Sequence, residues 1–147
     1  MRQSPTDPER LNPRQLIEFL RQFKASTGLH VDEVLVRRII SALFFAVFNY
    51  WAAKSYAKGK RGTGPNGDCL PYSMFLQEML QAGLEYVIYP LYLYRVSADH
   101  YALNPTVVEL TSKPFRGVRV EVKLSYEVVD KLLELVHDVL KYLERHV

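Results

Sequence analysis

The sequence of 147 residues has little cysteine, little glycine and no long uninterrupted hydrophobic run. Its single cysteine, Cys69, cannot form an internal disulfide, so we expect a cytoplasmic setting. The longest nearly apolar stretch, residues 39–53, is shorter than the roughly 20 residues of a membrane span and contains Ser41 and Asn49. The polar N-terminus has no signal-peptide pattern. We therefore expect a core helix here and no membrane association.

The composition is that of a soluble globular domain, with 48% hydrophobic and 24% charged residues. A net charge of +3 is too small to indicate nucleic-acid binding by itself. The charge is nonetheless uneven, because residues 34–67 contain six basic residues and no acidic one. This segment is either a positive surface or an ordinary solvated helix end with its loop.

Apolar residues at spacings of three and four predict four main helices. Gly28 is expected to end the first helix, Asp32 and Ser125 to cap the second and the last, and Pro90 to kink the third. The alternation of Val118, Val120, Val122 and Leu124 with charged residues predicts a short strand or hairpin at about 116–124. We expect the helices over residues 13–28, 32–57, 71–104 and 125–147.

This order predicts an all-α fold, an antiparallel bundle of four to five helices. We expect residues 1–12 to form a loose tail and residues 13–147 to form one helical domain. The glycine-rich segment 59–68 matches no phosphate-loop motif and is expected to be a mobile connection.

Arg95 and His100 are the strongest candidates for chemistry, near the end of the third predicted helix. Arginine binds phosphate well, and histidine exchanges protons near neutral pH. Five residues place the two side chains about 140° apart on a straight helix, so they meet only at a frayed helix end or across a two-fold interface. Asp99 lies four residues after Arg95, so an ordinary ion pair within the helix is the alternative.

The segment RVSADHY, residues 95–101, lies between a long apolar helix and a final amphipathic helix. Together with RRIISALFFAVFNYWAAKSY (37–56) and SYEVVDKLLELVHDVLKYLE (125–144), it resembles the HEPN family of small helical-bundle proteins. The resemblance covers about residues 31–146.

In that family an Arg-x(4–6)-His motif marks metal-independent ribonucleases, which places the catalytic roles on Arg95 and His100. The resemblance implies a homodimer in which two copies of the motif converge. His100 would act as general acid or base, and Arg95 would stabilise the phosphate charge while the RNA 2′-hydroxyl attacks phosphorus.

A non-catalytic HEPN-like subgroup, in which arginine precedes Ala-Asp-Tyr, is the alternative. RVSADHY is close to that pattern, and Val96 stands where active members usually have a polar residue. Such a protein would bind a nucleotide, RNA or a partner of nucleotidyltransferase type, as in toxin–antitoxin pairs. The sequence therefore leaves cleavage and binding open.

Several further residues are candidates for support or binding. Asn49 could orient His100 or a phosphate, or be a hydrogen-bonded core amide. Tyr94 and Tyr101 flank the motif and could stack on bases, or belong to the core. Cations after the second helix could attract RNA over a distance, namely Lys58, Lys60 and Arg61. We expect no metal and no cofactor, because His30, Cys69 and the other histidines have no ligand-like spacing.

Overall fold

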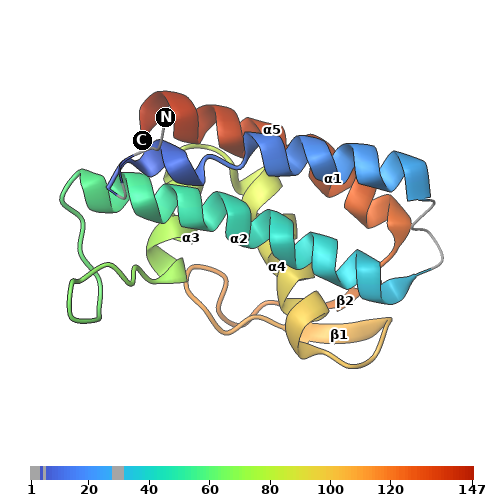
Figure 1. The fold of residues 1–147 in the computed structure, drawn as a ribbon. Helices are drawn as coiled ribbons and strands as arrows, with labels where there is room; N and C mark the ends of the chain where they lie inside the picture. Colours follow the sequence, from blue (N-terminus) through green and yellow to red (C-terminus); the bar gives the residue numbers. More distant parts are fainter. Residues whose placement is uncertain (1–3, 5, 28–31) are drawn as a thin grey trace.

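The second helix of the chain, α2, lies at the centre of the molecule and contacts every other helix (Figure 1). The computed structural model describes residue 4, residues 6–27 and residues 32–147. The expected end of the first helix at Gly28, and also His30, lie outside the described residues. The elements in chain order are the 3-10 helix η1 (Pro8–Leu11), α1 (Arg14–Thr27), α2 (Glu33–Ala57), α3 (Tyr72–Gln81), α4 (Glu85–His100), β1 (Thr106–Glu109), β2 (Arg119–Val122) and α5 (Tyr126–His146).

Both predicted N-caps are confirmed. The Asp32 carboxylate accepts hydrogen bonds from the Val34 and Leu35 N–H groups at 2.9 and 3.3 Å. The Ser125 hydroxyl accepts one from the Val128 N–H at 3.4 Å. These bonds satisfy N–H groups that have no partner inside the helix, and so set where α2 and α5 begin. The apolar stripes then bury against each other, and the largest side chains with at most 1% exposure include Trp51, Phe44, Phe75, Leu91 and Ile17.

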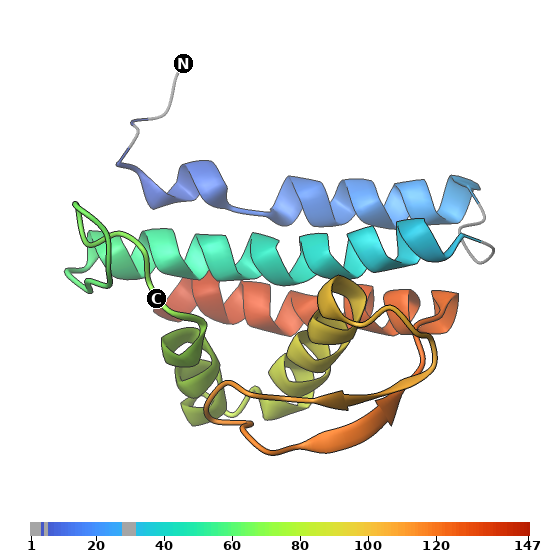
Figure 2. The ribbon, with the colours of Figure 1, turned by 90° about the horizontal axis from the view of Figure 1, so that it is seen from below.

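The fold is mostly helical as predicted, but the helices are not simply antiparallel. Figure 2 shows α1, α2 and α5 side by side with nearly aligned axes, while α3 and α4 cross them. Asn104 donates to Glu33 at the start of α2 (2.8 Å) and to the Leu124 carbonyl just before α5 (2.9 Å). Helices α2 and α5 therefore begin at the same end and run in the same direction, because residues 101–125 carry the chain back to that end.

The third predicted helix is in fact two helices, α3 and α4, while the expected kink at Pro90 stays a prediction. The break falls at Gly83, which has a positive φ of 80°. The Leu84 N–H donates to the Met79 carbonyl at 2.9 Å and the Gly83 N–H to the Leu80 carbonyl at 3.0 Å, the bonds of a glycine-terminated helix end. Pro90 lies inside α4 without ending it.

Helix α4 also ends earlier than predicted, at His100 instead of near Asn104. The next residues lead into β1, a strand that the sequence pattern did not indicate. It pairs antiparallel with β2, from Thr106 opposite Val122 to Glu109 opposite Arg119. The hairpin thus lies inside and before the predicted 116–124 range, and it is held to the core by the buried side chains of Val108, Leu110, Val122 and Leu124.

Part of the expected loose tail is attached to the bundle. Asp7 caps η1, and Glu9 accepts a hydrogen bond from the Tyr50 hydroxyl at 2.6 Å. Burial and the neighbouring Glu9 carboxylate raise the pKa of Tyr50, so this hydroxyl remains a donor. Asn12 donates to Glu144 near the end of α5 at 2.9 Å. A polar cluster therefore ties η1 to α2 and α5.

By length and composition alone, α2 could cross a membrane, and half of its most apolar window is buried inside the fold. Core helices of soluble proteins meet the same criterion. The expected absence of membrane association stays a prediction.

Two cations of α2 bind the carboxyl ends of two other helices. The Lys54 ammonium donates to the Leu143 carbonyl of α5 at 2.6 Å, and its side chain is only 10% exposed. The Arg37 guanidinium donates to four carbonyls at the end of α4. The acceptors are the carbonyls of Ser97 (3.3 Å), Ala98 (3.0 Å), Tyr101 (2.7 Å) and Ala102 (3.4 Å). Carbonyls at a helix end have no partner within the helix and carry partial negative charge, so buried cations stabilise both ends.

We predict that Arg37→Met lowers the free energy of unfolding by about 2–4 kcal/mol, because several carbonyls lose a charged donor in a partly buried place. Urea denaturation followed by circular dichroism measures this loss. Arg119→Met is the matched control on the exposed side of β2, where a change of about 0.5 kcal/mol or less is expected. Equal losses in the two variants would contradict the capping role.

The free energy of unfolding is expected to depend on pH through His137 on α5. Burial and the adjacent Arg21 guanidinium, which donates to the imidazole Nε2, lower the pKa of His137 below its ordinary value of 6.5. The His137 imidazole therefore binds a proton more readily in the unfolded chain than in the folded one. As a result, the free energy of unfolding falls as the pH decreases below about 6.5. We expect His137→Gln to flatten the decline in unfolding free energy between pH 7.5 and 5.5, measured by urea denaturation. An unchanged slope would contradict this assignment.

Candidate functional site

The guanidinium of Arg95 lies in an aromatic surrounding on the inner side of α4. Its side chain is only 9% exposed. The central carbon of the group is 4.8 Å from the ring centroid of Phe45, 5.3 Å from that of Tyr72 and 5.5 Å from that of Phe44. Cations over aromatic rings are attracted to the negative ring face. α2 and the first turn of α3 therefore fix the position of this arginine.

Asp99 orients Arg95 along the helix. The Arg95 Nε donates to the Asp99 Oδ2 at 2.9 Å, and the Ser41 hydroxyl donates to the same oxygen at 3.2 Å. The other oxygen, Oδ1, lies 3.6 Å from a terminal nitrogen of Arg38. The ion pair suggested by the i,i+4 spacing is therefore present. Two arginines share one carboxylate, which leaves a local excess of one positive charge.

The two terminal nitrogens of Arg95 are unpartnered. Within residues 6–27 and 32–147, neither makes a hydrogen bond to a protein atom. They are also not among the fully buried polar atoms that lack a partner, so they retain some access to solvent. An arginine that is mostly buried normally satisfies its five N–H donors within the protein. Here four donors are held in place and left open, which suits a phosphate or carboxylate.

His100 is separated from Arg95 on the helix surface. It is the last residue of α4 and is exposed. Arg95 shares a face with Asp99, whereas His100 shares another with Val96, which is 8% exposed. One copy of the chain therefore does not place the imidazole beside the guanidinium, as the 140° angle predicted.

Asn49 is neither a core amide nor close to this site. It is exposed and lines a different cavity, of about 650 Å³, together with Arg10, Tyr56 and Arg61. The interpretation of Asn49 as a core amide is therefore wrong, while a phosphate contact by Asn49 stays a prediction. The physical reason is its place on the outward stripe of α2, where the 3-10 helix η1 and the 59–68 loop cover only part of the surface.

The three cations after α2 lie far from Arg95. The Arg95 guanidinium lies over the Phe45 ring, and Phe45 and Lys58 are 13 residues apart, which corresponds to about 20 Å along the axis of α2. Lys60 pairs with Glu78 at 2.7 Å, and the Arg61 guanidinium donates to the Tyr56 carbonyl at 2.8 Å and lies over its ring. Of these three cations, Lys58 alone is exposed and has no ion-pair or hydrogen-bond partner for its side chain in the described part of the chain.

The flanking tyrosines have structural surroundings. Tyr94 packs half-buried against the core. The Tyr101 hydroxyl accepts a hydrogen bond from the Glu109 N–H at 2.9 Å and donates to the Glu109 carbonyl at 3.4 Å. Tyr101 thus fastens strand β1 to the end of α4.

Five residues that build the site were not predicted as part of it: Arg38, Ser41, Phe44, Phe45 and Tyr72. The first four lie at helical spacing along α2, and the missed signal is a polar and aromatic stripe within an otherwise apolar helix. Tyr72 comes from α3, and its approach is set by tertiary packing that local sequence does not encode.

Among residues 4, 6–27 and 32–147, no group of three or more histidine, cysteine, aspartate or glutamate side chains could hold a metal ion. No family model, no curated protein and no solved structure matches this chain.

We predict that Asp99→Ala destabilises the fold by about 2–4 kcal/mol, because it leaves the mostly buried Arg95 guanidinium without its counter-charge. Thermal or urea unfolding measures the change. The double variant Arg95→Met/Asp99→Ala should recover part of the loss, since no unpaired charge then remains. Additive losses would contradict direct pairing.

Proposed function

We propose that the protein is a HEPN-like module that binds RNA or a nucleotide by holding a phosphate on Arg95. The single observation that carries the proposal is the tip of Arg95, whose terminal nitrogens make no hydrogen bond to a described residue although the side chain is mostly buried. The order of helices and the RVSADHY segment resemble the HEPN family and support the same function.

Preorganisation makes this arginine suited to the task. Asp99 holds one edge of the guanidinium, and the three rings hold its position, so little side-chain entropy is lost when an anion binds. Arg38, whose side chain is 60% exposed, adds a second cation beside Asp99. A planar fork of N–H donors matches two phosphate oxygens better than an ammonium does.

Metal-independent RNA cleavage is a second candidate, favoured by the exposed imidazole of His100. Because Arg95 and His100 lie on different faces of α4, catalysis requires a homodimer in which one copy supplies the histidine near the other's arginine. The 2′-hydroxyl would attack phosphorus and break the P–O5′ bond, which leaves a 2′,3′-cyclic phosphate and a free 5′-hydroxyl. His100 would act as the base that takes the 2′-hydroxyl proton or as the acid that protonates the leaving 5′-oxygen. A partner of nucleotidyltransferase type and a cytoplasmic setting belong to the same proposal.

The binding function is tested with a fluorescently labelled single-stranded RNA in EDTA, followed by anisotropy. Arg95→Met should weaken binding at least tenfold, and Arg95→Lys should weaken it too, because it keeps the charge but loses the fork. Arg145→Met, an exposed cation at the end of α5, is the matched control and should stay within twofold. Circular dichroism checks that each variant is folded. Unchanged binding by folded Arg95→Met would contradict the proposal.

The cleavage candidate is tested on the same RNA by gel electrophoresis. If it is correct, the wild type yields fragments with cyclic phosphate ends in EDTA, and His100→Ala loses cleavage while it keeps RNA affinity. Equal cleavage by His100→Ala, or none by a wild-type dimer, would remove this candidate and leave binding.

A further inference from the structure

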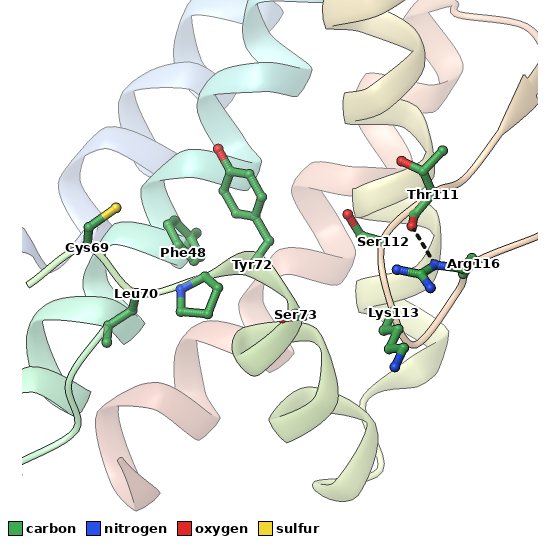
Figure 3. Close-up of a pocket in the computed structure, with 10 residues that line it drawn as sticks. Phe48, Cys69, Leu70, Tyr72, Ser73, Thr111, Ser112, Lys113 and Arg116 are labelled. Carbon is green, nitrogen blue, oxygen red and sulfur yellow. Dashed lines mark hydrogen bonds between the residues drawn. The ribbon is translucent and has the colours of Figure 1, made fainter. Parts of the chain in front are cut away.

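A second feature, a cavity of about 500 Å³, opens between the first turn of α3 and the loop that joins β1 to β2 (Figure 3). Its volume is within the range of about 300–1,000 Å³ that is common for small-molecule sites. Figure 3 shows Phe48, Cys69 and Tyr72 on one side and Thr111, Ser112, Lys113 and Arg116 on the other.

The charge of this cavity has one sign. Lys113 and Arg116 line it, and none of the described aspartate or glutamate residues does. Lys113 has no ion-pair or hydrogen-bond partner within the described ranges of the chain. The Arg116 Nε donates to the Thr111 carbonyl at 3.1 Å, which positions the guanidinium and leaves its terminal nitrogens for a ligand. Two unneutralised cations on one short loop favour an anionic ligand.

Neutral donors add to the two cations. Two serines with hydroxyl groups, Ser73 and Ser112, line the same cavity. Pro71 gives α3 no side-chain cap, and the Met74 N–H donates to the Pro71 carbonyl at 3.2 Å, so the N–H groups of Tyr72 and Ser73 are the ones left for other acceptors. Hydroxyls, cations and backbone N–H groups together are the set of donors that phosphate oxygens accept from.

The opposite wall is aromatic. Phe48 and Tyr72 line one edge of the cavity, with their ring centroids 4.8 Å apart. Phe48 is only 8% exposed and Tyr72 is half-buried, so Tyr72 offers the more accessible ring. Planar bases stack on such rings at about 1–3 kcal/mol per base. A ligand with both an aromatic and an anionic part therefore fits this cavity better than a simple anion does.

We infer that this cavity binds a nucleotide, with its phosphate on Lys113 and Arg116 and its base against Phe48 and Tyr72. The inference rests on the proposed function and names its ligand class. Tyr72 connects the two sites, since the same ring that lines the cavity lies 5.3 Å from the Arg95 guanidinium. The cavity is thus a base and phosphate subsite next to the Arg95 phosphate position.

The test is calorimetric titration of the whole chain with each of the four ribonucleoside 5′-monophosphates, with adenosine and with inorganic phosphate. At least one monophosphate should bind, and at least tenfold more tightly than adenosine or phosphate alone. Lys113→Gln/Arg116→Gln should weaken the best monophosphate at least tenfold. Arg119→Gln/Lys123→Gln, which removes two exposed cations from the same hairpin outside the cavity, should stay within twofold.

Arg116→Lys keeps the charge and should retain more affinity than the double glutamine variant. Absence of nucleotide binding, or equal loss in both double variants, would overturn the inference. Phosphate binding as tight as nucleotide binding would overturn the role of the aromatic wall. If the cavity variant loses no nucleotide affinity while Arg95→Met still loses RNA affinity, the cavity inference fails and the proposed function stands.

Discussion

The contact of Arg37 with the carboxyl end of α4 is the interaction on which the functional part of the molecule depends. One guanidinium satisfies carbonyls from Ser97 to Ala102, and its Nε bonds Glu33 at 3.1 Å. Bonds from Asn104 and Arg37 lower the pKa of Glu33, so this carboxylate stays charged well below neutral pH. The chain consequently leaves the helix at His100 and turns toward β1. The same contact fixes the depth and rotation of α4, and hence where Arg95 and Asp99 meet α2.

The centre of the resulting site is the Arg95 guanidinium, which contacts both a carboxylate and aromatic rings. Its inner edge and faces are satisfied by Asp99 and by aromatic rings, while its terminal nitrogens make no hydrogen bond within the described part of the chain and keep some access to solvent. A guanidinium that is held on one side and open to solvent on the other can donate to an anion without first breaking bonds inside the protein. No comparable contact from a described residue holds the exposed side chain of His100.

The sequence was sufficient for features that are encoded locally. Asp32, Ser125 and the apolar spacing predicted the start of two helices and most of the core. It was insufficient where distant groups compete for the backbone. Helix α4, whose end Arg37 caps, stops four residues before the end that the apolar pattern predicts. Strand β1 depends on pairing with β2 and on the Tyr101 hydroxyl. The site showed the same division, since the Arg95–Asp99 pair follows from helical spacing, whereas Tyr72 reaches it only through the packing of α3.

Lys54 follows Arg37 by 17 residues, and each caps a different helix. Helix α2 therefore fixes the separation between the two capping positions, at the ends of α4 and α5, at about 26 Å along its axis. One residue inserted between the two cations would rotate one cap by about 100° relative to the other, so that both could not be satisfied. The length of this segment is consequently more constrained than the identity of most of its exposed residues. Among relatives of this chain, insertions and deletions should fall in the 59–68 loop, outside this segment.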